Sequence, residues 1–302
     1  MSEQLAVMRM STYRSLCDKV REKTHTTDTI PAETMVGMLD EIGGGGVENG
    51  VSYDAFDSNY NVTEATYYSK NGHISPRTFY YFTAMKSITF ANGITDIGIS
   101  AFERCTSLVL NELPENVTNI GNFAFAYCQT LAPTHLPNNL TVIGNGAFQN
   151  CTKLALTSLP EGVTSIGSSA FNTCTNLALT SLPEGLTEIA NSAFVSCKNI
   201  TLSSLPKSIT KIGGYGFQAC VKLALTSLPE GLATVESSAF SNCTGLTSIT
   251  FKGTPTSIAN NAFSGCTNLL TINCPFGENE VANAPWGATN ATINYNYVEG
   301  GA

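Results

Sequence analysis

Residues 174–196, CTNLALTSLPEGLTEIANSAFVS, contain the pattern that decides the fold. Apolar residues of this stretch recur in its neighbours at a spacing of 23 residues. Two columns mark the spacing most clearly: Phe102, Phe125, Phe148, Phe171, Phe194, Phe217, Phe240 and Phe263, and Cys105, Cys128, Cys151, Cys174, Cys197, Cys220, Cys243 and Cys266. A fixed period between about 20 and 50 residues is the signature of a solenoid, so the sequence predicts a continuous stack of coils.

Each 23-residue unit contains three short stretches with different patterns. LALTSL begins with an alternation of period two, which predicts a strand, and Pro183 ends it because proline has no N–H to donate to a strand partner. LTEI predicts a second short strand. The recurring S-A-F-x-x-C segment is too short for a helix and predicts one tight helical turn. Stacking of such units predicts parallel strands between coils.

A family resemblance follows from this pattern. Leu159-Pro160, Val163, Ile166-Gly167, Ala170-Phe171 and Cys174 resemble the BspA-like, or Treponema pallidum-type, leucine-rich repeat. The resemblance implies a right-handed leucine-rich-repeat solenoid, mostly parallel β with short helical turns, and an adhesion or recognition role. The central units read LxLxxLP, whereas the family commonly has the LxxIxIP form, which only flanking units such as Leu246, Ile249 and Phe251 follow. The strand register of the central units therefore stays open.

The sequence divides into four parts. Residues 1–46 are expected to form two amphipathic helices that dock on another molecule, followed by a glycine linker. Residues 47–73 are expected to form an N-terminal β cap, residues 74–275 the solenoid with about eight regular repeats, and residues 276–302 a C-terminal cap. REKTHTTDTIPAETMVGMLDEI, residues 21–42, resembles a segment of prophage tail and minor structural proteins. The C-terminal tail resembles the ends of repeat proteins from gut Firmicutes and their prophages.

Composition excludes several classes of protein. Of the 302 residues 42% are hydrophobic, which is enough for a large core, and only 13% are charged. The net charge of −8 argues against nucleic-acid binding, and no apolar run reaches the length of a membrane-spanning helix, so direct membrane insertion is not expected. The N-terminus lacks the layout of a secretory signal, which favours cytoplasmic synthesis with virion assembly, with the cell surface as the alternative.

No stretch of the sequence predicts catalysis or cofactor binding. The cysteines form no close C-x-x-C pair of the kind that binds zinc, and we expect the cysteine column to consist of buried free thiols. The sequence shows no nucleophile elbow, phosphate loop or zincin motif, so we expect no metal, no cofactor and no enzymatic activity.

Candidate ligand-binding residues concentrate near the N-terminal cap. Aromatic residues that are exposed together would form a patch for a sugar or a protein, and His135 replaces a serine of the neighbouring units. The candidates are Tyr53, Tyr60, Tyr67, Tyr68, Tyr80, Tyr81 and His135. The expected partners are a protein or glycan on a host surface and an assembly partner for residues 1–46. Three functions stay open: a phage tail-associated recognition protein, a free surface adhesin of a gut bacterium, and a purely structural spacer.

Overall fold

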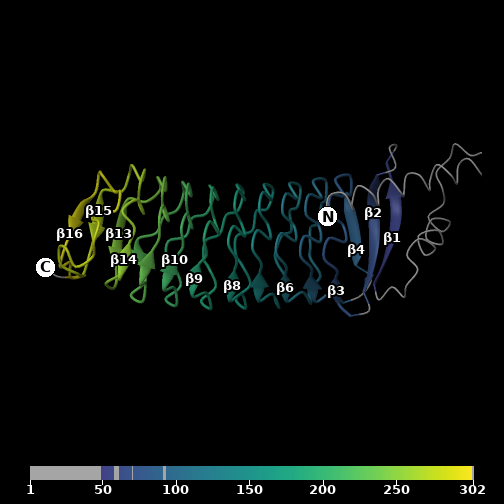
Figure 1. Ribbon diagram of the computed structural model, residues 1–302, viewed down its shortest axis with the longest axis horizontal. Coiled ribbons are helices and arrows are strands. Elements are labelled where there is room, and N and C mark those ends of the chain that lie inside the picture. The colour runs from purple at the N-terminus through teal and green to yellow at the C-terminus, as the bar shows by residue number, and fades with distance from the viewer. Residues whose placement is uncertain (1–48, 58–60, 70, 91–92, 301–302) are drawn as a thin grey trace, which may run out of the picture.

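The protein is a long rod of stacked coils (Figure 1). The computed structural model describes residues 49–57, 61–69, 71–90 and 93–300. The two expected helices of residues 1–46 lie outside these residues. Within the part that the structure describes there are strands and turns but no helix, so no helix there could span a membrane.

One edge of the rod is formed by strands of two residues, one from each coil, which pair in parallel with the strands of the coils on either side (Figure 1). The predicted LTEI strand is Glu188–Ile189, and its equivalents lie in the same place in the other coils. The outward residue of each strand is variable, whereas the apolar residue that follows points inward. One sheet contains β3 (His73–Ile74), β5 (Asp96–Ile97), β6 (Asn119–Ile120), β7 (Val142–Ile143) and β8 (Ser165–Ile166), and the next contains β9 (Glu188–Ile189), β10 (Lys211–Ile212), β12 (Thr234–Val235) and β14 (Ser257–Ile258).

The second predicted strand is absent from most central coils. LALTSL at residues 177–182 forms no strand, and only Ser227–Leu228 (β11) does so among the LxLxxLP units. In these units the buried leucines lie three residues apart, as in Leu179 and Leu182, with two exposed or half-exposed residues between them. A strand alternates its faces at every residue, so two leucines at this spacing cannot both face the core from one continuous strand. The expectation of a strand there was therefore wrong.

Both ends of the rod have strands on this second side, because the flanking units have the other spacing. The same tetrapeptide, Ser-Ile-Thr-Phe, forms β4 (Ser87–Phe90) near the N-terminal end and β13 (Ser248–Phe251) near the C-terminal end. β4 pairs in parallel with β2 (Val62–Ser69), which pairs antiparallel with β1 (Asn49–Phe56). β13 lies in a parallel sheet with β11, β15 (Thr271–Asn273) and β16 (Thr292–Asn294).

The S-A-F-x-x-C segment is a run of tight turns that bond to the next coil, not a helical turn. The N–H groups of Ser192, Phe194 and Ser196 donate to carbonyl groups of the following coil, over 2.8–2.9 Å. The N–H groups between them donate back to carbonyl groups three residues earlier in the same coil. Ser192 and Ser196 have φ of 57° and 58°. A right-handed helix requires negative φ throughout, so the prediction of a helical turn was wrong.

The core consists of columns that run along the rod. Phe79 and the eight phenylalanines at 23-residue spacing stack ring on ring, with centroids 5.1–5.7 Å apart and interplanar angles of 2–12°. The cysteine column lies beside them, and every described cysteine is buried and free. The last coil is covered by Trp286, which is fully buried and contacts Phe251 and Phe276 edge-on or at a tilt.

Candidate binding surface at the N-terminal end

An unusual set of side chains lies on the turn side of the first three coils. Tyr81, Arg104 and Tyr127 occupy one column, the residue before the Cys column, and each has φ between 63° and 66°. The same position in the later coils carries only small or short side chains: Asn150, Thr173, Ser196, Ala219, Asn242 and Gly265. Large side chains on this column are therefore confined to the N-terminal end of the rod.

These side chains stack on one another. The guanidinium carbon of Arg104 lies 5.0 Å from the ring centroid of Tyr81 and 4.6 Å from that of Tyr127, so it contacts both rings. Tyr81 packs edge-on against Tyr80, with centroids 4.9 Å apart, and the guanidinium of Arg77 lies 5.7 Å from the Tyr80 ring. We call Arg77, Tyr80, Tyr81, Arg104 and Tyr127 the tyrosine–arginine ridge. Its members are half-buried or exposed.

The two arginines of the ridge have unused hydrogen-bond donors. Neither Arg77 nor Arg104 makes a side-chain hydrogen bond or an ion pair with any residue that the structure describes. They are also the two arginines of the described residues. A guanidinium sandwiched between rings is held in position by cation–π contacts while its N–H groups point outward in its plane.

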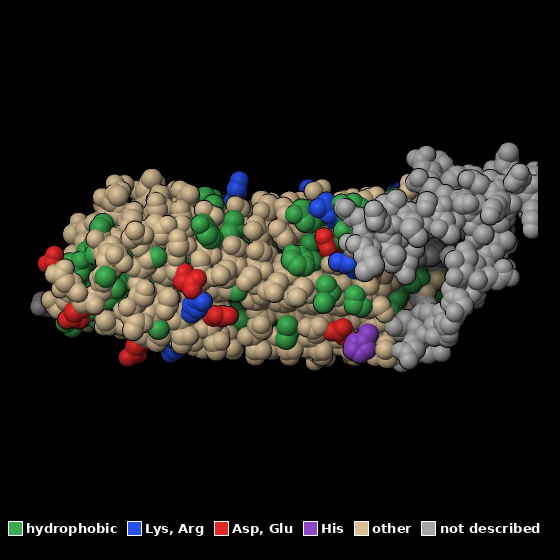
Figure 2. All heavy atoms as spheres, in the orientation of Figure 1, with side chains coloured by type: hydrophobic (Ala, Val, Ile, Leu, Met, Phe, Trp, Pro, Cys, Tyr) green, Lys and Arg blue, Asp and Glu red, His purple; other side chains and the backbone are tan. Residues whose placement is uncertain are grey.

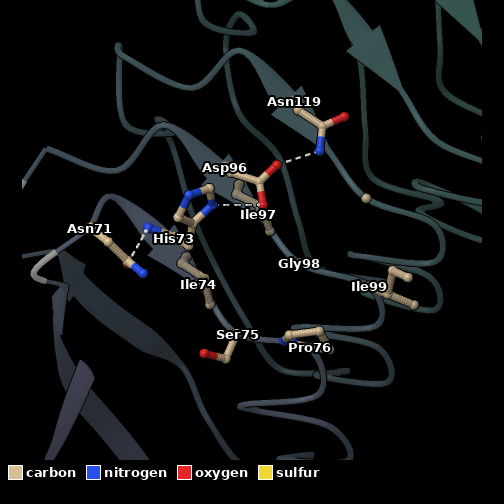
Figure 3. Close-up of a pocket in the computed structure, with 11 residues that line it drawn as sticks. Asn71, His73, Ile74, Ser75, Pro76, Asp96, Ile97, Gly98, Ile99 and Asn119 are labelled. Carbon is tan, nitrogen blue, oxygen red and sulfur yellow. Dashed lines mark hydrogen bonds and ion pairs between the residues drawn. The ribbon is translucent and has the colours of Figure 1, made fainter. Parts of the chain in front are cut away.

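A groove of about 350 Å³ lies beside the ridge, at the corner between the strand edge and the turn side (Figure 3). Asn71, His73, Asp96 and Asn119 line one side of it, and Ile99 lies on the other. Asp96 is held from two directions: its Oδ2 lies 3.2 Å from Nδ1 of His73, and its Oδ1 accepts a hydrogen bond from the Asn119 amide. The groove thus combines an apolar wall with imidazole, carboxylate and amide groups.

The groove and the ridge meet at one corner of the rod. Pro76 lines the groove, and the next residue, Arg77, belongs to the ridge. The N–H of Arg77 donates to the carbonyl of Ile99, which lines the groove, over 2.9 Å. Exposed apolar side chains add to this corner, because Ile99 is 50% exposed and Phe123, in the same column as Arg77, is 41% exposed. The two features form one surface.

The rest of the visible surface contrasts with this end. Figure 2 shows a face on which most side chains are neither charged nor hydrophobic, with few acidic and basic groups along the central rod. Strand-edge threonines contribute to this surface, and their hydroxyls donate to the backbone of the preceding coil, as in Thr141 to Thr118 over 3.0 Å. The hydroxyl donors of these threonines are therefore already hydrogen-bonded within the protein.

The tyrosines singled out from the sequence lie in different environments. Tyr67 is 1% exposed; its hydroxyl donates to the carbonyl of His73 over 2.9 Å, and its ring packs edge-on against Phe79. Tyr67 therefore fills the cap core and offers no surface to a ligand. Tyr68 is exposed, whereas Tyr80 and Tyr81 belong to the ridge. Tyr60 and the side chain of Tyr53 lie outside what the structure describes.

His135 does not join this surface. Its Nε2 lies 3.0 Å from the Glu115 carboxylate and its Nδ1 lies 3.1 Å from the Thr134 hydroxyl. Both contacts are local, and both members of the ion pair are well exposed.

Sequence reasoning did not predict several residues of this surface, namely Arg77, Arg104, Tyr127 and the groove side chains. The spacing of 23 residues between Tyr81, Arg104 and Tyr127 was the signal that could have found the ridge.

The cysteine column offers no alternative site. Each thiol of this column donates to the carbonyl oxygen of a phenylalanine 26 residues earlier, over 2.9–3.0 Å. Burial raises the pKa of the Cys174 and Cys220 thiols above the usual range, so they stay protonated at neutral pH. The described residues contain no group of three or more His, Cys, Asp or Glu side chains placed to bind a metal.

Comparison with known proteins agrees with this architecture. The family model for the BspA type leucine-rich repeat region matches residues 49–178 and 187–289, in six copies. The chain belongs to this family. The BspA-type assignment covers the coils that contain the ridge and the groove, whereas residues 1–46 lie outside the match. No curated protein is significantly similar in sequence.

Solved structures with the same repeats resemble this BspA-type chain. A leucine-rich repeat protein of Bacteroides ovatus has a TM-score of 0.52 and 22% identity, over 82% of this chain and 75% of that one. A leucine rich cell surface protein of Faecalibacterium prausnitzii has a TM-score of 0.43 and 23% identity, over 80% and 81%. The T. pallidum leucine-rich repeat protein has a TM-score of 0.42 and 22% identity, over 71% and 86%. At these identities the similarity to the Bacteroides protein shows the fold alone.

Proposed function

We propose that this chain is a non-catalytic recognition protein that binds a host-surface protein or glycan through the N-terminal end of its solenoid. The observation that carries this proposal is the stack of Tyr81, Arg104 and Tyr127 in a column that is otherwise small and polar. Tyrosine and arginine dominate the energetics of binding surfaces because they bury much area and still form hydrogen bonds.

The ridge is suited to binding because its side chains are already ordered. A flexible arginine loses rotamer entropy when it binds, whereas the Arg104 side chain is held between two rings before any ligand arrives. The adjoining groove adds polar groups at fixed positions, and its volume of about 350 Å³ lies within the usual range for a small-ligand site, roughly 300–1,000 Å³. A surface adhesin would use such an end to contact its target.

The experiment measures binding of the full chain to a mucin-coated sensor and to intact epithelial cells. The double variant Tyr81→Ala with Tyr127→Ala removes both rings that flank Arg104, and we expect it to bind at least about tenfold more weakly. Tyr215→Ala is the matched control, because Tyr215 is 45% exposed on the turn side of a later coil. This control should bind like the wild type.

Two results would overturn the proposal. Equal binding by the double variant and the wild type would show that the ridge is not the recognition surface. Failure of the wild-type chain to bind either the mucin or the cells would remove the recognition function itself. Circular dichroism of each variant establishes that the comparison is made between folded proteins.

A narrower proposal concerns where the recognition takes place. The resemblance of residues 21–42 to prophage tail proteins supports a chain that is made in the cytoplasm, assembles into a virion through residues 1–46 and presents the solenoid outward. A free adhesin at the surface of the bacterial cell is the alternative. Both use the same end of the rod, so the binding experiment above applies to either.

A further inference from the structure

We infer that the tyrosine–arginine ridge binds the acidic group of a sugar, a carboxylate or a sulfate, with Arg104 as the principal donor. This inference rests on the proposed recognition function and adds the chemical class of the ligand. Its starting point is the unused hydrogen-bonding capacity of Arg104. Its guanidinium contacts the rings of Tyr81 and Tyr127, and its side chain has no acidic or hydrogen-bonding partner among the described residues.

The geometry of the sandwich selects an anion in the plane of the guanidinium. The rings of Tyr81 and Tyr127 belong to the coils before and after that of Arg104, so a ligand would reach the guanidinium between them, at the N–H groups that the rings leave open. A carboxylate or sulfate presents paired oxygen atoms that match these N–H groups with two parallel hydrogen bonds. A lysine at the same position could provide the charge but neither the fork nor the stacking.

The charge of the surroundings supports the same assignment. The chain as a whole has a net charge of −8. Arg77 and Arg104 nevertheless lie on the same ridge, with Tyr80 and Tyr81 between them. Neither arginine has an ion-pair partner in the described ranges. Glu103 is the acidic neighbour in sequence, and it forms no ion pair with Arg104. Two uncompensated cations on an acidic protein attract an anion locally while the rest of the rod repels it.

A sugar fits the adjoining groove better than an acidic peptide does. Its polar lining consists of side-chain amides, an imidazole and a carboxylate, from Asn71, His73, Asp96 and Asn119. These groups include both donors and acceptors, which is what the hydroxyl groups of a sugar ring require. The Asp96 carboxylate would instead repel a second acidic side chain of a peptide, so the groove favours a neutral, hydroxyl-rich portion next to the acidic group.

The test uses a carboxylated oligosaccharide, its neutral ester and a sulfated oligosaccharide. Titration calorimetry compares the full chain with tetragalacturonate, which carries carboxylates, with the methyl ester of the same tetrasaccharide, which is neutral, and with a carrageenan tetrasaccharide, which carries sulfates only. We expect one or both acidic probes to bind, and the methyl ester to bind at least about tenfold more weakly than tetragalacturonate if carboxylates are recognised. Added sodium chloride should weaken the binding.

The variants test Arg104 itself. Arg104→Gln should weaken binding of the acidic probe about tenfold or more, and Arg104→Lys should restore only part of the loss because lysine lacks the planar fork. Lys198→Gln, which removes an exposed positive charge from a later coil, is the control and should bind like the wild type. The melting temperatures of the variants establish that they remain folded.

Several results would overturn the inference. They are binding of neither acidic probe, measurable and equal binding of tetragalacturonate and its methyl ester, unchanged binding by Arg104→Gln, and equal or tighter binding of a polyglutamate peptide. If the chain still binds mucin through Tyr81 and Tyr127 in any of these cases, the recognition function stands and only the acidic-sugar assignment fails. The comparison of carboxylated and sulfated probes identifies which acid the ridge prefers.

Discussion

The thiol of Cys174 donates a hydrogen bond to the carbonyl oxygen of Phe148 in the preceding coil, with the sulfur 3.0 Å from the oxygen. The same relationship recurs between the two columns along the rod, from Cys105 with Phe79 to Cys266 with Phe240. The cysteines therefore act as small core residues that also connect neighbouring coils. This role accounts for a conspicuous cysteine period without disulfides or metal.

The buried thiols predict a loss of stability at alkaline pH. Burial raises the pKa of Cys266 to about 11 and that of Cys274 to about 12, whereas a thiol in the unfolded chain titrates near about 8.5. The unfolded state therefore loses protons first, so the contribution of the thiols to the free energy of unfolding is constant below about pH 8 and falls as the pH rises toward the folded-state values. Urea unfolding monitored by circular dichroism between about pH 7 and pH 10.5 measures this fall.

A matched variant isolates the thiols from other groups that titrate in this range. Cys174→Ala with Cys197→Ala removes two fully buried thiols, so its urea midpoint should fall less steeply with pH than that of the wild type, even though the variant is less stable at neutral pH. Parallel slopes for the two proteins would contradict the assignment. Rapid reaction of the described cysteines with iodoacetamide in the native protein at pH 8 would also contradict it.

Truncation of a ring in the phenylalanine column should cost more in the middle of the rod than at its end. Phe171 stacks on Phe148 and Phe194, with centroids 5.4 and 5.6 Å away, and Phe171→Ala should lower the free energy of unfolding by about 3–5 kcal/mol. Phe263 stacks on one phenylalanine only, Phe240, so its loss should be smaller by about 0.5–1.5 kcal/mol. Chemical unfolding gives both values, and equal losses would argue against nearest-neighbour stacking as the source of stability.

Gly146 and Phe123 should be energetically coupled. A Cβ atom at Gly146 would lie 2.4 Å from Cε1 of Phe123, so Gly146→Ala must displace this ring and should cost about 1–2 kcal/mol. The φ of Gly146, 59°, adds a strain of about 1 kcal/mol for alanine that is independent of the ring. In the double variant with Phe123→Ala the part of the penalty that comes from the ring should disappear. Additive losses in a double-mutant cycle would show that the ring is not the cause.

The segment before the solenoid should govern the association state of the full chain. Tyr13, Leu16, Cys17 and Val20 recur at the spacing of one helical face, and the two short amphipathic helices predicted from the sequence would require a partner surface to bury that face. If the partner is a second copy, light scattering should show an oligomer that Leu16→Asp with Val20→Asp converts to a monomer. Ser15→Asp, off the predicted face, serves as the control. A wild-type monomer would contradict self-association through this segment.

Most of the fold follows from the period alone. Residues that repeat every 23 positions must occupy the same place in successive coils, so the repeat spacing is sufficient to assign Phe171 and Cys174 to continuous columns. The short strand at Glu188–Ile189 was also predicted, from the apolar–polar–polar–apolar stretch LTEI.

The local conformation of the turn side was not predictable in the same way. A short segment such as residues 192–197 is compatible with one helical turn as long as its hydrogen bonds remain within the coil. In the stack, alternate N–H groups find carbonyl partners in the next coil, which favours alternating turns with positive φ at Ser192 and Ser196. Whether this segment forms a helical turn or alternating turns depends on the carbonyl groups of the neighbouring coil, which cannot be known from the local sequence.

The sequence by itself determined the solenoid, its repeat length and the phenylalanine and cysteine columns, because a strict period leaves one way to bury the repeated apolar residues. The tertiary structure decided which surface residues act together. Tyr81, Arg104 and Tyr127 are far apart along the chain and become neighbours only because one turn of the solenoid brings residues 23 apart into contact. Tyr67, close to them in sequence, is instead directed into the core, since it lies on the inner face of β2.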